Sequence, residues 1–480
     1  MNAITNIEPK AVFYWFAQLS AIPRGSGNEQ AVSDFLVQFA RNRNLTCHQD
    51  AALNVIIKKP GTAGYEHSAP IILQGHMDMV CEKTPESSHD FLKDPIKLIV
   101  EGDILRADGT TLGGDDGIAV AYALAILDSD CIAHPPLEVL ITTNEETGMD
   151  GAKAVQAGLL HGKMLFNIDS EEEGVFLVSC AGGAHALIDF PIETEPVQHE
   201  SLSITVSGLY GGHSGAEIDK QRANALKVLA RLLYEVKSQQ EVHIVSISGG
   251  SKHNAIAKEA AACISLKDSR SAQQTLKQLA AQIANEYRIT DKGLHISITP
   301  CEAASKVMFT QKLSADIIDF MMMIPNGVQY MSADIPGLVQ TSLNVGILQV
   351  EGTQLRFTIS VRSSIKSALD EILHVLHICA DKTRATFTQT AEYPAWEYAA
   401  HSPARDIAVK TYTELTGKAP VITAIHAGLE CGLLKEIIPD MDAVSFGPNL
   451  YDIHTPNERL SISSVERTWH FIVKLLENLR

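Results

Sequence analysis

The chain lacks the features of a membrane or secreted protein. No apolar run approaches the roughly 18 residues that a membrane-spanning helix needs, and the apolar stretch 118–127 is short and contains a tyrosine. The start of the chain, Met1-Asn2-Ala3-Ile4-Thr5, has neither the basic nor the apolar region of a secretory signal. Eight cysteines are present without any Cys-x-x-Cys pair, which favours a reduced, cytoplasmic protein.

Basic side chains are also scarce. The 480 residues include 39 Lys and Arg against 57 Asp and Glu, which gives a formal net charge of -18. This balance argues against nonspecific binding to DNA, RNA or an anionic membrane. It says nothing positive about a substrate, because acidic proteins are common in the cytosol. The hydrophobic content of 45% is that of an ordinary globular protein, and the length predicts two or more domains.

Helical and strand patterns alternate in the N-terminal part of the chain. Residues 31–41 have helical spacing, and 118–127 have the pattern of a buried helix. Short apolar runs at 71–73, 137–142 and 164–168 predict buried strands. This alternation predicts an α/β fold with a mixed, largely parallel sheet, in which functional residues gather beyond the carboxyl ends of the strands.

Histidines and carboxylates follow several of these predicted elements. They are His76 with Asp78, Asp115 with Asp116, Glu145 with Glu146, Asp169, and His454. Together they offer two imidazoles and several carboxylates, which are the donors that hard-to-borderline dications prefer. Their order suits two metal ions that share one carboxylate. The set predicts a metal-dependent hydrolase.

Each of these motifs has a plausible chemical role and a plainer alternative. Residues two apart on an extended segment face the same way, so His76 can bind a metal while Asp78 accepts its other N–H; the alternative is an ordinary strand-end turn. Asp115 lies in a glycine-rich turn where its carboxylate could bridge two metals, but aspartate also caps helices. Glu145 and Glu146 could divide the work of general base and ligand, or form a solvated acidic turn.

The pattern changes after Cys180-Ala181-Gly182-Gly183, where alternating strands and an amphipathic helix at 220–238 follow. Tyr393-Pro394-Ala395-Trp396 is typical of a linker. Because His454 lies so near the C-terminus, the last segment must return to the first domain. We therefore expect two domains. The discontinuous domain that holds the metal centre comprises residues 1–183 and 393–480, and the inserted α+β lid domain comprises residues 184–392.

Two residues of the expected lid domain could contact a substrate. His213 lies in Gly211-Gly212-His213-Ser214-Gly215 and could polarise a carbonyl oxygen, although many such histidines are structural. Arg362 ends a predicted strand and could bind a carboxylate. An arginine in that position also commonly forms a surface ion pair.

In this order the motifs resemble the family of co-catalytic zinc aminopeptidases, carboxypeptidases and dipeptidases that includes aminoacylase and peptidase T. The likeness runs through nearly the whole chain and is greatest to one branch, the bacterial cytosolic Xaa-His (aminoacyl-histidine) dipeptidases. The strings that resemble this branch are Leu73-Gln74-Gly75-His76-Met77-Asp78-Met79-Val80, Gly109-Thr110-Thr111-Leu112-Gly113, Asp169-Ser170-Glu171-Glu172-Glu173-Gly174, Gly211-Gly212-His213-Ser214-Gly215 and His426-Ala427-Gly428-Leu429-Glu430-Cys431-Gly432.

The resemblance implies two zinc ions in each subunit, with Co²⁺ or Mn²⁺ as substitutes. Their implied ligands are His76, Asp115 and Asp169 for one ion, and Asp115, Glu146 and His454 for the other. Family members often have Ala-Asp-Asn where this chain has Gly114-Asp115-Asp116. The first aspartate is common to both, so the bridge is assigned to Asp115, with Asp116 as a weaker candidate.

The resemblance also implies the remaining roles. Glu145 would be the general base and Asp78 the carboxylate that orients His76. The implied substrate contacts are His213, Asn254, Arg362 and Gly428. The substrate would be a small peptide, with no nucleic acid or membrane partner, and assembly as a homodimer is an open alternative. An aminotripeptidase, a carboxypeptidase or an amide deacylase would have the same metal centre, and a non-catalytic metal-binding scaffold would have lost a ligand or the base.

Overall fold

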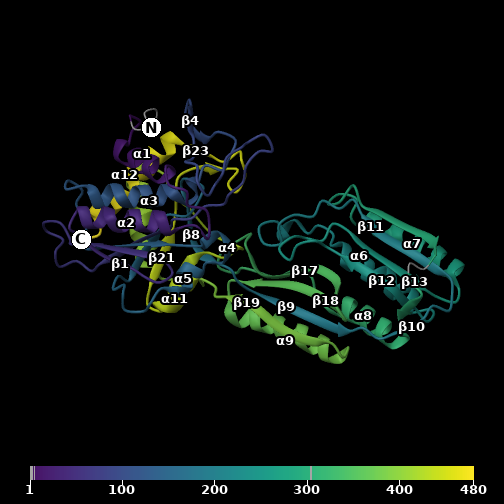
Figure 1. The fold of residues 1–480 in the computed structure, drawn as a ribbon. Coiled ribbons are helices and arrows are strands. Elements are labelled where there is room, and N and C mark those ends of the chain that lie inside the picture. The colour runs from purple at the N-terminus through teal and green to yellow at the C-terminus, as the bar shows by residue number, and fades with distance from the viewer. Residues whose placement is uncertain (1–3, 5, 303–304) are drawn as a thin grey trace. The chain divides into compact units, whose positions relative to one another are not determined.

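The computed structural model describes residue 4, residues 6–302 and residues 305–480. The chain forms two compact units (Figure 1). Unit 1 comprises Met1–Ser179, Tyr398–Ala424 and Leu429–Arg480, and unit 2 comprises Cys180–Glu397 and Ile425–Gly428. The divisions lie a few residues from those expected from the sequence, and the short segment that contains Gly428 groups with unit 2 rather than with its neighbours in the sequence.

Unit 1 is built on an eight-stranded mixed sheet. In spatial order its strands are β1 (Thr46–Gln49), β2 (Val55–Lys59), β6 (Leu137–Thr142), β3 (Ile71–His76), β7 (Met164–Asn167), β21 (Asp442–Ser445), β8 (Val175–Cys180) and β20 (Val421–Ile425). The four central strands β6, β3, β7 and β21 are parallel, whereas β1, β2 and β8 pair antiparallel to their neighbours. The predicted α/β fold with a mixed sheet is confirmed.

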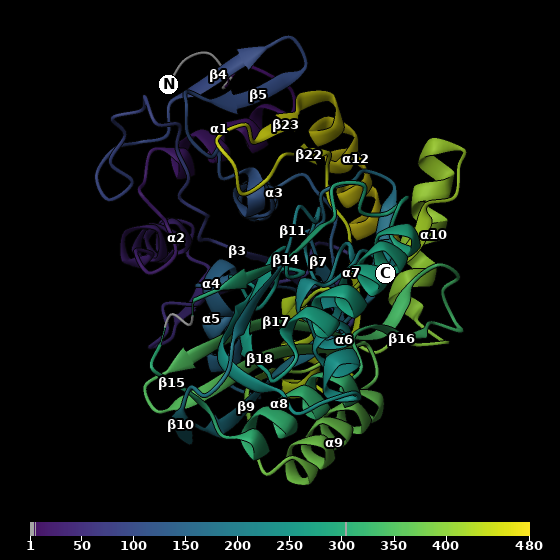
Figure 2. The same ribbon diagram turned by 90° about the vertical axis from the view of Figure 1, so that its right-hand side faces the viewer.

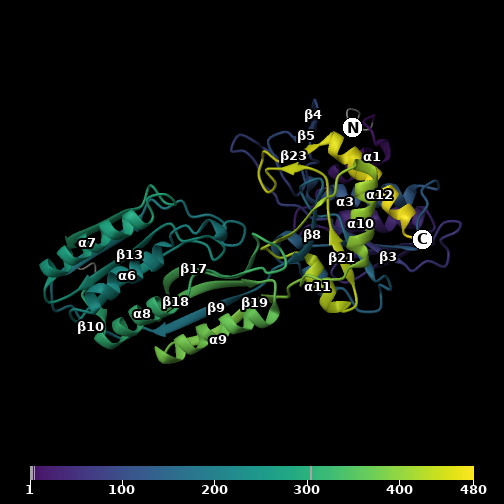
Figure 3. The same cartoon turned by 180° about the vertical axis from the view of Figure 1, so that it is seen from behind.

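Helices cover both faces of this sheet, which is why all six residues of β3 and of β6 are buried. Figure 1 shows α1, α2 and α3 on one face and α5 and α11 on the other. Figure 3 shows α10 beside β21, and α12 packs against α10. The helices of unit 1 are α1 (Lys10–Ser20), α2 (Gln30–Asn42), α3 (Gly114–Asp128), α4 (Glu145–Gly148), α5 (Asp150–Ala154), α10 (Pro403–Thr416), α11 (Glu430–Ile437) and α12 (Ile462–Asn478).

A small second sheet of unit 1 joins an early hairpin to the C-terminal part of the chain. Its order is β22 (Leu450–Tyr451), β23 (Arg459–Ser461), β5 (Ile104–Ala107) and β4 (Leu98–Glu101). The loop between β22 and β23 contains His454, so this pairing fixes both ends of that loop.

Unit 2 contains a nine-stranded sheet in which neighbouring described strands pair antiparallel. Its strands are β14 (His295–Cys301), β11 (Ser201–Ser207), β13 (Ala260–Ser265), β12 (His243–Gly249), β17 (Val339–Glu351), β18 (Gln354–Ser363), β9 (Gly182–Pro191) and β19 (Thr386–Tyr393), with β16 (Gly327–Met331) on β17, beside a two-stranded sheet of β10 (Thr194–Pro196) and β15 (Val307–Phe309). One face is covered by helices (Figure 2): α6 (Ala225–Lys237), α7 (Ser269–Glu286), α8 (Gln311–Met323) and α9 (Lys366–Lys382); the short 3-10 helix η1 (Ile218–Lys220) precedes them.

Most predicted elements are present, and the differences lie at their ends. The helix expected at 220–238 begins only at Ala225, because the side chain of Asn224 accepts the backbone N–H groups of Leu226 and Lys227 and so caps it. The helix expected at 118–127 begins at Gly114, although Asp115 in its first turn has a non-helical backbone. Within the described part of the chain, no helix is long and apolar enough to cross a membrane.

Candidate active site

The carboxyl ends of three neighbouring parallel strands bring together side chains that are distant in the sequence. His76 is the last residue of β3 and pairs with Thr142, the last residue of β6. Helix α4 begins with Glu145 and Glu146 just beyond β6, and Asp169 follows β7, which lies on the other side of β3. The site therefore lies at the edge of the sheet where α/β proteins place their functional residues.

Asp115 lies between the two histidines. Its Oδ1 is 3.1 Å from Nε2 of His76, and its Oδ2 is 3.1 Å from Nε2 of His454. Nε2 of His454 is also 2.9 Å from a carboxylate oxygen of Glu146. One carboxylate thus faces two imidazoles with separate oxygens, which is the geometry that a bridging ligand requires.

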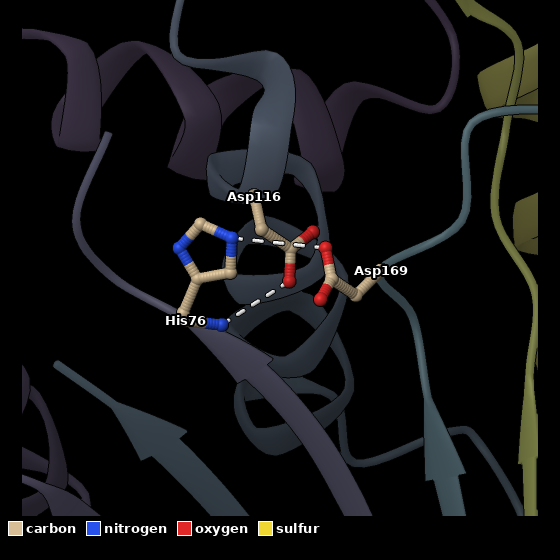
Figure 4. Close-up of side chains that lie close together, drawn as sticks. All are labelled: His76, Asp116 and Asp169. Atoms are coloured by element: carbon tan, nitrogen blue, oxygen red, sulfur yellow. Dashed lines mark hydrogen bonds and ion pairs between the residues drawn. The ribbon is translucent and has the colours of Figure 1, made fainter. Parts of the chain in front are cut away.

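Asp116 points to a different part of the same site (Figure 4). Its Oδ2 accepts the backbone N–H of His76 at 3.1 Å, and its side chain is buried. Nε2 of His76 lies 3.7 Å from Oδ1 of Asp169. Three groups of side chains in the described residues are close enough to hold a metal ion: His76, Asp116 and Asp169; His76, Glu145 and Glu146; and Asp115, Glu146 and His454.

Asp78 connects His76 to the turn that contains the two glutamates. Its Oδ1 is 3.3 Å from Nδ1 of His76 and accepts the backbone N–H of Glu145 at 3.1 Å. Its Oδ2 accepts the hydroxyl of Ser26 at 2.7 Å and the backbone N–H of Glu146 at 3.3 Å. A fully buried carboxylate with these contacts fixes both the imidazole and the turn. The contact from Ser26 has no signal in the sequence.

The charges of this cluster are strongly coupled. Burial raises the pKa of Glu145 well above its usual value, and the neighbouring carboxylates of Asp169 and Glu146 add to the effect. Burial also raises the pKa of Asp169 to about 6. Hydrogen bonds to Asp115 and Glu146 raise the pKa of His454 to about 11. Crowded, buried carboxylates are poorly stabilised as anions, and a bound dication relieves their repulsion.

A further buried glutamate, which the sequence analysis missed, holds the turn of Asp115. Oε2 of Glu458 accepts the backbone N–H groups of Leu112 and Gly113 at 2.7 and 3.0 Å, and Oε1 accepts those of Gly114 and Asp115 at 2.7 and 3.3 Å. Successive N–H groups that converge on one anion form a nest. The only sequence signal is the position of Glu458 shortly after His454.

Arg24 is a second missed residue. Its guanidinium is buried and donates to the backbone oxygens of Met77 and Asp78 at 2.8 and 3.1 Å. It also donates to the backbone oxygen of Gly113. Arg24 thereby ties the turn after β3 to the turn before α3, which hold the first histidine and the central aspartate of the site.

In unit 2, His213 and Asn254 lie in adjacent segments. The backbone N–H of Ser214 donates to the backbone oxygen of Asn254 at 2.9 Å. Nδ1 of His213 accepts the backbone N–H groups of Gly215 and Ala216 at 3.2 and 3.0 Å. Burial and the nearby charge of Arg362 lower the pKa of His213. The neutral imidazole therefore keeps its proton on Nε2, where it can be donated to a ligand.

Arg362 lies near the end of β18 without a carboxylate partner. Its Nη1 donates to the hydroxyl of Tyr393 at 3.1 Å, and its Nε is buried without a hydrogen-bond partner. Across residues 6–302 and 305–480, the side-chain partner of this guanidinium is Tyr393, and it forms no ion pair with a carboxylate. Burial and the charge of Arg362 also lower the pKa of His426, to about 3. The surface ion pair considered from the sequence is absent from this described region, and the cation is free to bind an anion.

The comparisons with known proteins identify the family. A model of peptidase family M20/M25/M40 matches residues 72–478, and this chain belongs to that family. It is 36% identical over 485 aligned residues to the cytosol non-specific dipeptidase of Escherichia coli (strain K12). The alignment covers 100% of this chain and 99% of that protein.

The solved structures agree. The aminoacylhistidine dipeptidase from Vibrio alginolyticus matches with a TM-score of 0.93 and 35% identity, over 99% of this chain and 98% of that one. The aminopeptidase PepT from Bacillus cereus ATCC 10987 matches with a TM-score of 0.57 and 15% identity, over 98% and 99% of the two chains, and so shares the fold alone. The resemblance predicted from the sequence is confirmed.

Proposed function

We propose that this protein hydrolyses dipeptides, including Xaa-His dipeptides, with a metal-activated water. The observation that best supports the proposal is the placement of Asp115 between His76 and His454, each 3.1 Å from one of its carboxylate oxygens. The similarity of this chain to a non-specific dipeptidase and to an aminoacylhistidine dipeptidase extends over nearly its whole length and supports the same substrate class.

The residues of the cluster fit two zinc ions, with Co²⁺ or Mn²⁺ as substitutes. The proposed ligands are His76, Asp115 and Asp169 for one ion, and Asp115, Glu146 and His454 for the other. The second set is one of the three clustered groups, whereas the group with His76 and Asp169 contains Asp116 in place of Asp115. Zinc commonly binds imidazole and carboxylate donors of this kind, and the crowded anionic side chains favour a dication over a monovalent one. When bound, the two ions would lower the pKa of a water molecule and polarise the peptide carbonyl.

Glu145 is the proposed general base. Glu145 is the first residue of α4, and its backbone N–H donates to the carboxylate of Asp78. Burial and neighbouring anions raise the pKa of Glu145, and a base is most effective when its pKa approaches the working pH. Glu145 would take the proton of the attacking water and pass it to the leaving amine.

His213 is proposed to stabilise the oxyanion that forms during attack. Its Nδ1 is occupied by two backbone N–H groups, so only Nε2–H remains as a donor. A donor that is oriented in advance needs no reorganisation as charge develops on the oxygen.

Arg362, Asn254 and Gly428 are proposed to contact the C-terminal part of the dipeptide. The unpartnered guanidinium of Arg362 suits a carboxylate, because arginine can donate two parallel hydrogen bonds to one. Asn254 lies in a segment fixed to the sheet: Nδ2 of Asn344 donates to the backbone oxygens of His253 and Ala255 at 3.3 and 2.8 Å.

Other hydrolases of the same fold are the second candidate. An aminotripeptidase, a carboxypeptidase or an amide deacylase would use the same metal centre and differ in the residues that contact the substrate. A non-catalytic scaffold is disfavoured, since the proposed base and all five proposed metal ligands are present in the sequence. We further propose a cytoplasmic location, small peptides as the ligand class, and neither nucleic acid nor membrane as a partner.

A substrate panel with metal analysis tests the proposal. The panel would contain Xaa-His dipeptides, other dipeptides, tripeptides and N-acyl amino acids. We expect hydrolysis of dipeptides, loss of activity with a chelator, and recovery on addition of zinc with two ions bound per chain. Faster hydrolysis of tripeptides or N-acyl amino acids would reassign the substrate, and activity that survives chelation would overturn the metal mechanism.

A further inference from the structure

Glu430 is a buried carboxylate beneath the metal cluster that has no role in the function proposed above. It is the first residue of α11 in unit 1, and it is 0% exposed. Among the described residues its side-chain hydrogen-bond partners are Gln74 and Thr142, and it forms no ion pair. An anionic group without a cationic partner is costly to bury, so its presence calls for a specific reason.

The carboxylate of Glu430 connects neighbouring strands of the sheet. Its Oε2 accepts the side-chain N–H of Gln74 at 2.5 Å and the hydroxyl of Thr142 at 2.6 Å. Gln74 in turn accepts the side-chain N–H of Asn167 through its Oε1 at 2.6 Å. All four side chains are buried. One acidic group thus anchors a hydrogen-bonded chain across β6, β3 and β7.

Each of the three strands that these hydrogen bonds connect ends close to a residue of the metal cluster. Gln74 precedes His76 by two residues on β3, and Asn167 precedes Asp169 by two residues at the end of β7. Thr142 is the last residue of β6, three residues before Glu145. A shift between these strand ends would therefore displace the histidine, the aspartate and the glutamate relative to one another.

We propose that Glu430 is a positioning residue for the metal centre, acting through Gln74 and Thr142. It holds the carboxyl ends of β3 and β6 in register and so fixes the separation between His76 and Glu145. The proposal rests on the function assigned to the cluster but concerns residues that touch neither metal nor substrate. Outer residues that orient metal ligands commonly affect metal affinity or activity by about 10–100-fold when they are removed.

A role in simple packing does not explain the observations. An apolar side chain at position 430 would remove the shortest acceptor of Gln74 and Thr142. Their donors would keep only longer contacts of 3.3 Å, from Gln74 Nε2 to Thr142 Oγ1 and from Thr142 Oγ1 to the backbone oxygen of Gly75, and weakening hydrogen bonds in a buried site is costly. Burial raises the pKa of Glu430 to about 7, and its Oε1 has no hydrogen-bond partner. Burial of the Glu430 carboxyl group is therefore unfavourable for the free energy of folding.

The test compares Glu430→Ala and Glu430→Gln with a control at another buried glutamate. Glu138 lies on β6, the strand that ends at Thr142, and accepts the backbone N–H groups of His161 and Gly162 at 2.7 and 2.9 Å, away from the metal cluster. Glu138→Ala therefore removes a similar buried carboxylate without reaching His76 or Glu145. Zinc affinity would be measured by competition with a chelating dye, together with kcat and KM on a dipeptide and the melting temperature.

We expect Glu430→Ala to weaken zinc binding and lower kcat by about 10–100-fold with little change in KM. Glu430→Gln should recover most of both, because its carboxamide oxygen can still accept the two hydrogen bonds. Glu138→Ala should lower the melting temperature and leave zinc affinity and kcat unchanged. If Glu430→Ala does not fold, Thr142→Val provides the second test, with a smaller loss in the same direction.

Several outcomes would overturn the proposal. Wild-type zinc affinity and kcat in folded Glu430→Ala or in Thr142→Val would do so, as would equal losses in Glu138→Ala. Failure of Glu430→Gln to recover any activity would show that charge, and not position, is what matters. Zinc affinity reports on positioning even without turnover, so a wild-type protein that hydrolyses no dipeptide would refute the proposed function and leave this test intact.

Discussion

Oε1 of Glu458 lies 2.7 Å from the backbone nitrogen of Gly114, a residue 344 positions earlier in the chain. The same carboxylate accepts three more backbone N–H groups between Leu112 and Asp115. Glu458 is itself in the loop that contains His454, where its N–H donates to the backbone oxygen of Thr455. One side chain thus connects the loop of the central aspartate to that of the second histidine.

The first prediction follows from this contact. Glu458→Gln replaces one acceptor oxygen by an NH₂ group that faces backbone N–H donors, so the turn of Asp115 should be displaced. Zinc affinity should fall by about 10–100-fold, measured by calorimetry. Glu466→Gln, a half-exposed glutamate on α12, is the control and should bind zinc as the wild type does. Unchanged affinity in Glu458→Gln would show that the nest does not position Asp115.

The second prediction concerns the general base. Glu145→Gln should keep both metals and lose turnover by about 10²–10⁴-fold, because it removes a proton acceptor rather than a ligand. Metal content would be measured by mass spectrometry and kcat on a dipeptide. A variant that lost one zinc but kept substantial activity would require the roles of Glu145 and Glu146 to be exchanged.

Asp115→Ala should behave differently. Its two carboxylate oxygens face His76 and His454 separately, so its loss should weaken both metal sites and abolish turnover. Asp116→Ala is the matched comparison, since Asp116 accepts the backbone N–H of His76 instead. We expect metal analysis to give the larger loss for Asp115→Ala. Full occupancy of two ions in that variant would contradict the bridging assignment.

Metal binding should release protons and weaken as the pH falls. Hydrogen bonds to carboxylates raise the pKa of His454 to about 11, and they raise that of His76 as well, against the effect of burial. Without metal His454 therefore holds a proton at neutral pH, which a metal must displace, and the raised pKa of His76 acts in the same direction. Calorimetric zinc titrations in buffers of different ionisation enthalpy should therefore show a net release of protons on binding. A proton release of zero would contradict the prediction.

The carboxylate-binding role of Arg362 predicts a specific dependence on the substrate. Amidation of the C-terminus of a good dipeptide should remove a charge-assisted hydrogen bond, which is worth roughly 1.5–3 kcal/mol. This corresponds to a loss in kcat/KM of about 10–150-fold. Arg362→Ala should remove most of the difference between acid and amide. Equal rates on both substrates with the wild-type protein would move the carboxylate-binding role to another residue.

The local chemistry of the site could be predicted because its donors lie in short sequence motifs. A buried strand followed by His76 and Asp78, or by Glu145 and Glu146, places donors at a strand end whatever the rest of the chain does. The alternation of strands and helices similarly predicts parallel neighbours whose carboxyl ends meet. The fold class and the types of donor could therefore be predicted from the sequence, and the structure brings those donors of unit 1 together.

The tertiary structure decided which residues support these donors. Ser26, Arg24 and Glu458 have no distinctive local pattern, and Glu430 is noted from the sequence only as part of a string that carries the family resemblance. Each of the four contacts the site across a long stretch of sequence. The resemblance assigned the bridge to Asp115, with Asp116 as a weaker candidate. In the structure Asp115 faces the two imidazoles, whereas Asp116 accepts the backbone N–H of His76 and lies in a group with His76 and Asp169 that could hold a metal ion. Short-range patterns determine what a segment can do, whereas the pairing of distant segments depends on how the whole core packs.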